Sequence, residues 1–140
     1  MGRNHLELYV HFVWGTWDRQ PIITTDIERP LYRAIQERAQ WLGCEVLALN
    51  GMEDHTHLLL SFTSRVTMAE IMKEVKGGSS NAINKMADRP YDFKWQGGYG
   101  AFTVSKRQLP QVIRYVEKQK AHHAANQLYM LYELPLADHP

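Results

Sequence analysis

Residues 54–62 read Asp-His-Thr-His-Leu-Leu-Leu-Ser-Phe, an apolar run that opens with two histidines one residue apart. A short run of this composition predicts a buried β-strand. Side chains alternate along a strand, so His55 and His57 project from one face. The opposite face then carries the apolar side chains Leu58, Leu60 and Phe62. Two imidazoles about 7 Å apart can converge on one metal ion; the alternative is a pair of histidines satisfied by neighbouring hydrogen bonds.

A second polar cluster lies within residues 109–123, where the periodicity is helical and Pro110 suits a first helical turn. Tyr115, Gln119 and His122 fall at positions i, i+4 and i+7, on one face of that helix. A buried face would carry apolar residues, and a solvated face would carry Glu and Lys. A row of phenol, amide and imidazole fits neither description, and by itself it only suggests a functional site.

Together these residues resemble the single-tyrosine HUH transposases of the insertion-sequence-200-like type. In that family two histidines around a hydrophobic residue bind a divalent metal, and a helix with Tyr-x-x-x-Gln supplies the nucleophile and a third ligand. The matching residues are His55-Thr56-His57 and Tyr115 with Gln119. Thr56 departs from the aliphatic residue that is usual between the histidines. The resemblance covers nearly the whole chain and includes residues 11–14, 76–84 and 95–105.

The resemblance implies that Tyr115 is the catalytic nucleophile and that His55, His57 and Gln119 hold a divalent metal, Mg²⁺ or Mn²⁺. Two imidazoles and an amide oxygen suit Mn²⁺ better than a pure oxygen site would. The implied activity is metal-assisted cleavage and rejoining of single-stranded DNA through a 5′-phosphotyrosine intermediate. The implied partners are single-stranded DNA, with hairpins at the element ends, and a second copy of the chain. The homodimer would share its active sites, with the tyrosine helix acting in cis or in trans.

The positive charge is concentrated in the segment that carries the tyrosine. The net charge is only +1, but residues 65–120 hold 11 basic and 5 acidic side chains. A phosphate backbone would need such charge, and a solvated basic surface is the alternative reading. In the family the middle helix lies against DNA, and Arg114 and Lys118 lie within one turn of Tyr115. The candidate DNA-binding residues are Lys73, Lys76, Ser79, Ser80, Lys85, Arg114 and Lys118.

The periodicity predicts seven elements in the order β-α-β-β-α-β-α. Strands are expected over residues 5–17, 44–50, 54–62 and 95–105, with helices between them and after the last. Asn50-Gly51 predicts a turn between two strands, and Gly77-Gly78 predicts a kink or a close backbone approach in the middle helix. The order predicts an α+β fold, a ferredoxin-like antiparallel sheet with helices on one face and an added C-terminal helix carrying the tyrosine.

Two interpretations are possible for His11, and two for the pair His122 and His123. His11 lies on the polar face of the first strand, and we expect a hydrogen-bonding neighbour of the histidine pair rather than a ligand. His122 or His123 could exchange a proton with the substrate, or could simply cap the helix C-terminus.

Length and composition predict a single domain over residues 1–140. Hydrophobic residues make up 44% and charged residues 22%, as in ordinary globular proteins. We expect no membrane segment, because no apolar run approaches 18 residues. The single cysteine, Cys44, fits a reducing cytoplasm, which is the expected location.

Three rival functions remain to be weighed against the transposase. A two-histidine phosphoesterase would need a second H-x-T/S motif, which the chain lacks. A structural metal-binding protein would leave the Tyr-x-x-x-Gln row unexplained. A non-catalytic DNA-binding remnant of a transposase is the principal alternative, and metal-dependent nicking would separate it from the enzyme.

Overall fold

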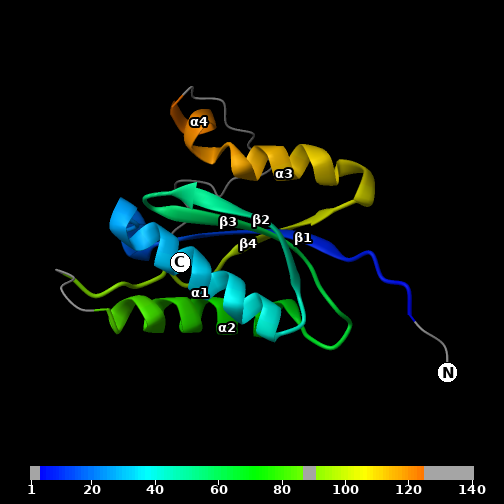
Figure 1. Ribbon diagram of the computed structural model, residues 1–140, viewed down its shortest axis with the longest axis horizontal. Helices are drawn as coiled ribbons and strands as arrows, with labels where there is room; N and C mark the ends of the chain where they lie inside the picture. The colour runs from blue at the N-terminus through cyan, green and yellow to red at the C-terminus, as the bar shows by residue number, and fades with distance from the viewer. Residues whose placement is uncertain (1–3, 87–90, 125–140) are drawn as a thin grey trace.

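The computed structural model describes residues 4–86 and 91–124, and in these ranges the chain forms one four-stranded sheet with helices on both faces (Figure 1). The spatial order of the strands is β2-β3-β1-β4, and every neighbouring pair is antiparallel. This order, with its two split β-α-β units, is the predicted ferredoxin-like arrangement. The strands are β1 (Tyr9–Gly15), β2 (Glu45–Met52), β3 (His55–Ser61) and β4 (Gly100–Val104).

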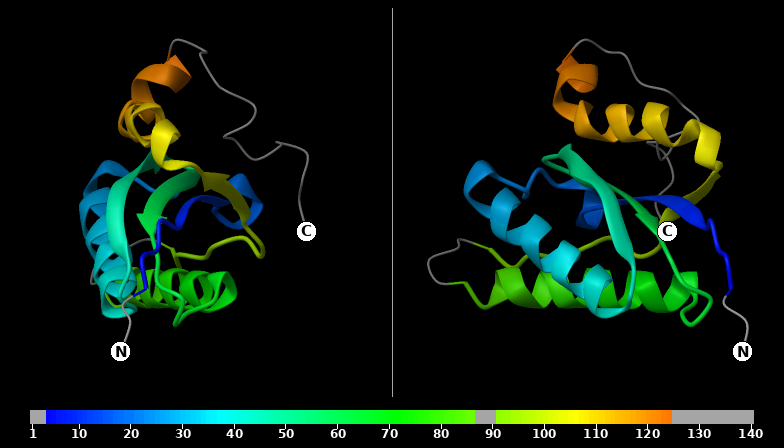
Figure 2. Two further views of the ribbon diagram at one scale, coloured as in Figure 1. Left: turned by 90° about the vertical axis from the view of Figure 1, so that its right-hand side faces the viewer. Right: turned by 45° about the vertical axis from the view of Figure 1, so that its right-hand side comes forward.

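The helices form two layers, one on each face of the sheet. The long helices α1 (Thr25–Trp41) and α2 (Met68–Asn84) pack against each other under one face. The helices α3 (Leu109–Glu117) and α4 (Gln119–Ala124) lie over the opposite face (Figure 2). Short 3-10 helices, η1 (Trp17–Arg19) and η2 (Lys106–Gln108), follow β1 and β4. The central strands β1 and β3 are therefore buried on both sides.

Two hydrophobic cores explain why β3 is apolar without a break. Leu58 and Leu60 point into the larger core, between the sheet and the α1–α2 layer. Leu59 points the other way, into a smaller core where it packs with Val112 and Val116 of α3. Because both faces of β3 are covered, its residues need not alternate between apolar and polar.

Capping explains where two of the helices begin. The predicted capping box of α2 is present: the Thr67 hydroxyl accepts from the backbone N–H of Glu70, and the Glu70 carboxylate accepts from the backbone N–H of Thr67. A second capping box, Ser105 with Gln108, opens η2 and leads into α3. Pro110 lies in the first turn of α3, as predicted.

The predicted turn at Asn50-Gly51 is wrong. Strand β2 continues to Met52, so that Gly51 pairs with Thr56 and the turn falls at residues 53–54. Gly51 is needed for a close approach instead, because a Cβ atom there would lie 2.2 Å from the carbonyl oxygen of His55. The Asn-Gly signal marked a tight contact between strands rather than a reversal of the chain.

The predicted kink in the middle helix is also wrong, since α2 runs unbroken from Met68 to Asn84. Gly77 is open to solvent, whereas Gly78 faces α1, where a Cβ atom would lie 2.6 Å from Cγ of Arg38. The close approach that the two glycines indicated is therefore made by an arginine side chain of α1.

Two predicted strands are shorter than expected. Residues 5–8 are not in a strand, and Leu6 and Leu8 are exposed, because β3 and β4 both stop pairing at Tyr9. The last strand begins at Gly100, and Trp95 makes only one isolated bridge, to Thr16. Gly98, with φ +82°, interrupts the extended backbone between them.

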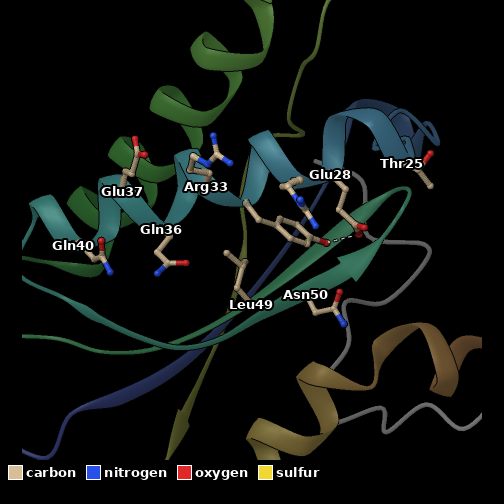
Figure 3. A pocket seen from close by; sticks show the side chains of 10 residues that line it. Thr25, Glu28, Arg33, Gln36, Glu37, Gln40, Leu49 and Asn50 are labelled. Carbon is tan, nitrogen blue, oxygen red and sulfur yellow. Dashed lines mark hydrogen bonds between the residues drawn. The ribbon is translucent and has the colours of Figure 1, made fainter.

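A groove of about 780 Å³ runs between α1 and the edge strand β2 (Figure 3). The Tyr32 hydroxyl donates to Glu28 at its mouth, and burial raises the pKa of that phenol. The rest of the lining mixes basic and acidic side chains, so it shows no preference for an anion or a cation. Across the described ranges, no helix has the length and apolar character needed to span a bilayer.

Candidate active site

The beginning of β3 places His55 and His57 on the sheet face that α3 covers. Their ring centroids lie 5.2 Å apart with the ring planes at 68°, and both side chains are almost fully buried. The alternation that the sequence predicted is therefore present, with Leu58 on the opposite face. The two imidazoles are close enough to act on one ligand.

Both imidazoles are oriented by hydrogen bonds at Nδ1. The Nδ1 atom of His55 lies 2.7 Å from Oδ1 of Asp54, and that of His57 lies 2.8 Å from Nε2 of His11. Since a carboxylate can only accept, the proton in the first hydrogen bond lies on Nδ1 of His55. In the second, donation from His57 to His11 would likewise place the proton on Nδ1 of His57. His11 is thus the hydrogen-bonding neighbour that the sequence led us to expect.

A third group, Arg19, joins the Asp54–His55 pair from η1. Its guanidinium lies 3.3 Å from Oδ2 of Asp54 and 3.4 Å from Nδ1 of His55. Burial alone would raise the pKa of Asp54, but the hydrogen bond with His55 and the charges of His55 and Arg19 hold that pKa below its usual value. Asp54 therefore stays ionised and keeps His55 oriented.

Tyr115 and Gln119 approach the histidines from α3 and α4. The phenol ring of Tyr115 lies 5.9 Å from the ring of His57, measured between centroids, and is 2% exposed. Gln119 is fully buried and donates its side-chain amide to the backbone carbonyl of Tyr115 at 3.3 Å. The two motifs that the sequence singled out, far apart along the chain, thus meet within one subunit.

We had expected one continuous helix to carry this row, but the helix is interrupted. It ends at Glu117, and Lys118 has non-helical backbone angles before α4 starts at Gln119. Polar contacts with β2 hold this junction: the Asn50 side chain donates to the carbonyl of Glu117, and the Lys120 ammonium donates to Asn50 and to the carbonyl of Gly51. The break leaves the contact between Tyr115 and Gln119 intact.

Comparison with known proteins now decides the family. Residues 4–119 match the family described as Transposase IS200 like. The chain belongs to this family. The ISDra2 transposase TnpA of Deinococcus radiodurans is 27% identical over 124 residues, which cover 84% of this chain and 89% of that relative.

Two solved structures resemble this transposase closely. The crystal structure of a putative transposase from Deinococcus radiodurans has a TM-score of 0.66 and 26% identity, and the match covers 85% of this chain and 96% of the other. A REP-associated tyrosine transposase bound to a REP hairpin has a TM-score of 0.64 and 13% identity, over 96% and 81% of the two chains. The second match shows the fold alone.

The hydrogen bonds of the two histidines suit the binding of a divalent metal, but among the described residues few further side chains are available as ligands. Hydrogen bonds donated by Nδ1–H to a carboxylate or a second imidazole are a usual support for histidines that bind a metal through Nε2. In the described ranges, no group of three or more His, Cys, Asp or Glu side chains is placed to hold a metal. The third protein ligand would therefore have to be the Gln119 amide oxygen, as the family pattern implies.

The predicted DNA-binding residues fall on both sides of the sheet. Arg114 and Lys118 are exposed beside Tyr115, whereas the predicted residues of α2 lie in the opposite layer (Figure 1). Ser79 is fully buried and accepts from the indole N–H of Trp95, and the Lys76 ammonium donates to the backbone carbonyls of Gln96 and Gly98. Burial lowers the pKa of Lys76. Of the predicted residues in α2 and at its C-cap, Lys73 and Lys85 are exposed, and Lys76 and Ser80 are partly exposed.

Sequence reasoning missed two residues that the fold brings to the site, Asp54 and Arg19. Asp54 carries a signal, because it directly precedes His55. No feature of the sequence points to Arg19, because it lies 35 residues away from its partner Asp54. The side chains of His122 and His123 lie outside the part of the chain whose side chains are described.

Proposed function

We propose that this transposase cleaves and rejoins single-stranded DNA with Tyr115 as the nucleophile and with a divalent metal held by His55, His57 and Gln119. One observation carries the proposal: the Tyr115 ring lies beside the ring of His57, one of two buried imidazoles oriented at Nδ1, and buried Gln119 donates to the backbone carbonyl of Tyr115. A structural role for each motif alone would not require them to meet. Membership of a transposase family gives that cluster a reaction to perform.

The chemistry proceeds in two transesterifications. The phenolate oxygen of Tyr115 attacks a backbone phosphorus, the bond from phosphorus to the 3′ oxygen breaks, and that oxygen leaves as a 3′-hydroxyl after taking up a proton. The product is a 5′-phosphotyrosine, which keeps the energy of the phosphodiester. A 3′-hydroxyl of another strand then attacks the same phosphorus and loses its proton, and Tyr115 leaves. No nucleotide triphosphate is consumed.

The protein must help the phenol to ionise. An ordinary tyrosine has a pKa of about 10, so on the order of 0.1% is phenolate at neutral pH. When bound, the metal polarises the phosphate and stabilises the charge that develops in the transition state. Arg114 and Lys118 flank Tyr115 in sequence, and their exposed cations are placed to draw the phosphate towards the tyrosine helix.

Attack requires the tyrosine to become accessible. Its ring is 2% exposed in this structure, and polar contacts from Asn50 and Lys120 anchor the junction between α3 and α4 to β2. DNA binding must therefore shift α3 relative to the sheet before the phenol oxygen can meet a phosphorus. Lys73 and Ser80 of α2, with Lys85 at its C-cap, would bind the DNA backbone further from the scissile phosphate, together with any contribution from Lys76 and Ser79 after such a rearrangement.

Replacing Tyr115 with Phe tests the proposal. The protein is incubated with Mn²⁺ and a labelled single-stranded hairpin oligonucleotide taken from the flanks of its own gene. Wild type should form a covalent complex that survives denaturing electrophoresis, and Tyr115→Phe should form none while it still binds the oligonucleotide. Chelation of the metal with EDTA should abolish the adduct in wild type.

Two results would contradict this scheme in different ways. An unchanged adduct in Tyr115→Phe would remove the nucleophile assignment. DNA binding without any metal-dependent nicking in wild type would instead support the alternative, a DNA-binding remnant that has lost catalysis.

A further inference from the structure

An exposed tryptophan stands next to the histidine end of the site. Trp17 opens η1, directly after β1, and 44% of its surface is accessible. Large apolar side chains with this exposure are few in the described ranges. A solvent-facing indole has no role in the hydrophobic core, so its position calls for another explanation.

The Trp17 indole contacts a cation, and its neighbours in η1 are Asp18, which is exposed, and Arg19, which pairs with Asp54. The Lys94 ammonium lies 3.9 Å from the centroid of the indole ring, a cation–π contact, and Lys94 is itself exposed. The Arg19 guanidinium follows two residues later in the same 3-10 helix. An aromatic plane next to positive charge is the combination by which proteins hold single-stranded nucleic acid, because a base stacks while the cations attract its phosphates.

The indole is held in place by the backbone around it. The N–H of Trp17 donates to the carbonyl of Lys94, and the N–H of Asp18 donates to the side-chain carbonyl of Gln96. Asp18 and Arg19 both adopt positive φ angles, 52° and 51°, which side chains with a Cβ atom rarely do. Such a conformation persists only where the neighbouring structure imposes it. The backbone that carries the indole is thus held by these contacts before any ligand arrives.

The same short segment is tied to the candidate metal ligands. The N–H of Thr16 donates to the carbonyl of Asp54, and Arg19 contacts both Asp54 and His55. Gly15 is the direct pairing partner of His55 in the sheet. A base stacked on Trp17 would therefore lie near His55, one of the candidate metal ligands.

We propose that Trp17, with Lys94, is a stacking subsite for one unpaired base of the single-stranded DNA beside the scissile phosphate. The inference rests on the proposed function, since it specifies how that same site holds its substrate. The subsite recognises a base plane rather than a base sequence, because every base offers a π face. Its task is to fix the DNA strand so that a neighbouring phosphate is presented to the site.

A matched control is available on the same helix layer. Trp41 is also exposed, and the guanidinium of Arg38 lies 4.3 Å from its ring centroid. It is the last residue of α1, a helix of 17 residues whose beginning follows η1, so it lies about 25 Å further along that helix. Trp41 shares the chemistry of Trp17 but not its place beside the histidines.

The test measures binding to two chains of equal charge by fluorescence anisotropy. One is an oligothymidylate of about 16 nucleotides, and the other is an abasic phosphodiester chain of the same length. Trp17→Ala and Trp17→Leu should weaken binding of the oligothymidylate by about 5- to 150-fold and leave binding of the abasic chain unchanged. Trp17→Phe should retain most of the affinity, and Trp41→Ala should match wild type with both chains.

Each other outcome overturns the inference. Wild-type affinity for oligothymidylate in folded Trp17→Leu, or an equal loss with the abasic chain, would exclude base stacking. Thermal melting confirms the fold of each variant, and Trp17→Leu preserves apolar volume in case Trp17→Ala does not fold. The covalent assay separates the two proposals: absence of the adduct in wild type would refute the proposed function, whereas the stacking subsite is judged by the binding of oligothymidylate and the abasic chain alone.

Discussion

Thr56 lies between the two candidate metal ligands and points away from them. It is fully buried, and its hydroxyl has no hydrogen-bond partner among the described residues. A buried polar group without a partner costs about 1–3 kcal/mol. This is the position where the family usually has an aliphatic residue, so the departure seen in the sequence has a physical consequence for stability rather than for metal binding.

We expect Thr56→Val to stabilise the protein by about 1 kcal/mol, because it removes the hydroxyl and keeps the shape of the side chain. For a chain of this length the melting temperature should rise by about 3 °C, measured by calorimetry. Thr103→Val, on the exposed side of β4, is the control and should change stability by less than about 0.5 kcal/mol. Covalent adduct formation should be retained in both. A lower melting temperature for Thr56→Val would mean that the hydroxyl is satisfied in solution.

At the scale of elements, the hairpin of β2 and β3 determines the position of His55. Its strands approach so closely at Gly51 that a Cβ atom would collide with the backbone of His55 and Thr56. Backbone atoms cannot rotate away as a flexible side chain can. The hairpin would have to open, and the histidine nearest its turn would move with it.

We therefore predict that Gly51→Ala destabilises the protein by about 3 kcal/mol or more, measured by urea unfolding. Gly77→Ala is the matched control, since a Cβ atom there meets nothing within 4 Å and the residue lies inside α2. That substitution should stabilise the protein by about 0.5–1 kcal/mol. Equal effects of the two substitutions would show that the contact at Gly51 relaxes without cost.

At the scale of the whole molecule, the open question is which subunit supplies the tyrosine. In this structure Tyr115 docks beside His57 of its own chain. A shared site would need the segment of α3 and α4 to leave the sheet and the same segment of a partner to replace it. The contacts that would break first are those of Asn50 and Lys120 with the junction between the two helices and β2.

On the family resemblance we predict a homodimer, so sedimentation at micromolar concentration should give about twice the chain mass of 16.3 kDa. If the sites are shared, a mixture of Tyr115→Phe and His57→Ala subunits should recover adduct formation that neither variant has alone. A monomer in the centrifuge would contradict the dimer. A dimer without recovery would assign each tyrosine to the histidines of its own subunit, as they are docked here.

The sequence by itself determined the class of fold, the two motifs of the candidate site and the family. These are local properties: a period of two in the strands, a period near 3.6 in the helices, and fixed spacings within His55–His57 and Tyr115–Gln119. Local patterns fail where a glycine serves a contact with another segment: Gly51 was taken for a turn, and Gly78 for a kink or a close approach by a backbone, whereas the contact is with the Arg38 side chain.

Only the tertiary structure decided how the motifs are supported. His11 orients His57 from 46 residues away, and Arg19 reaches Asp54 and His55 from another strand end. Tertiary contacts also bury Ser79 and turn Lys76 towards backbone carbonyls, whereas their residue types had suggested contact with DNA. A hydrogen bond requires two groups to be close in space. When they belong to different elements, their separation along the sequence does not predict that distance.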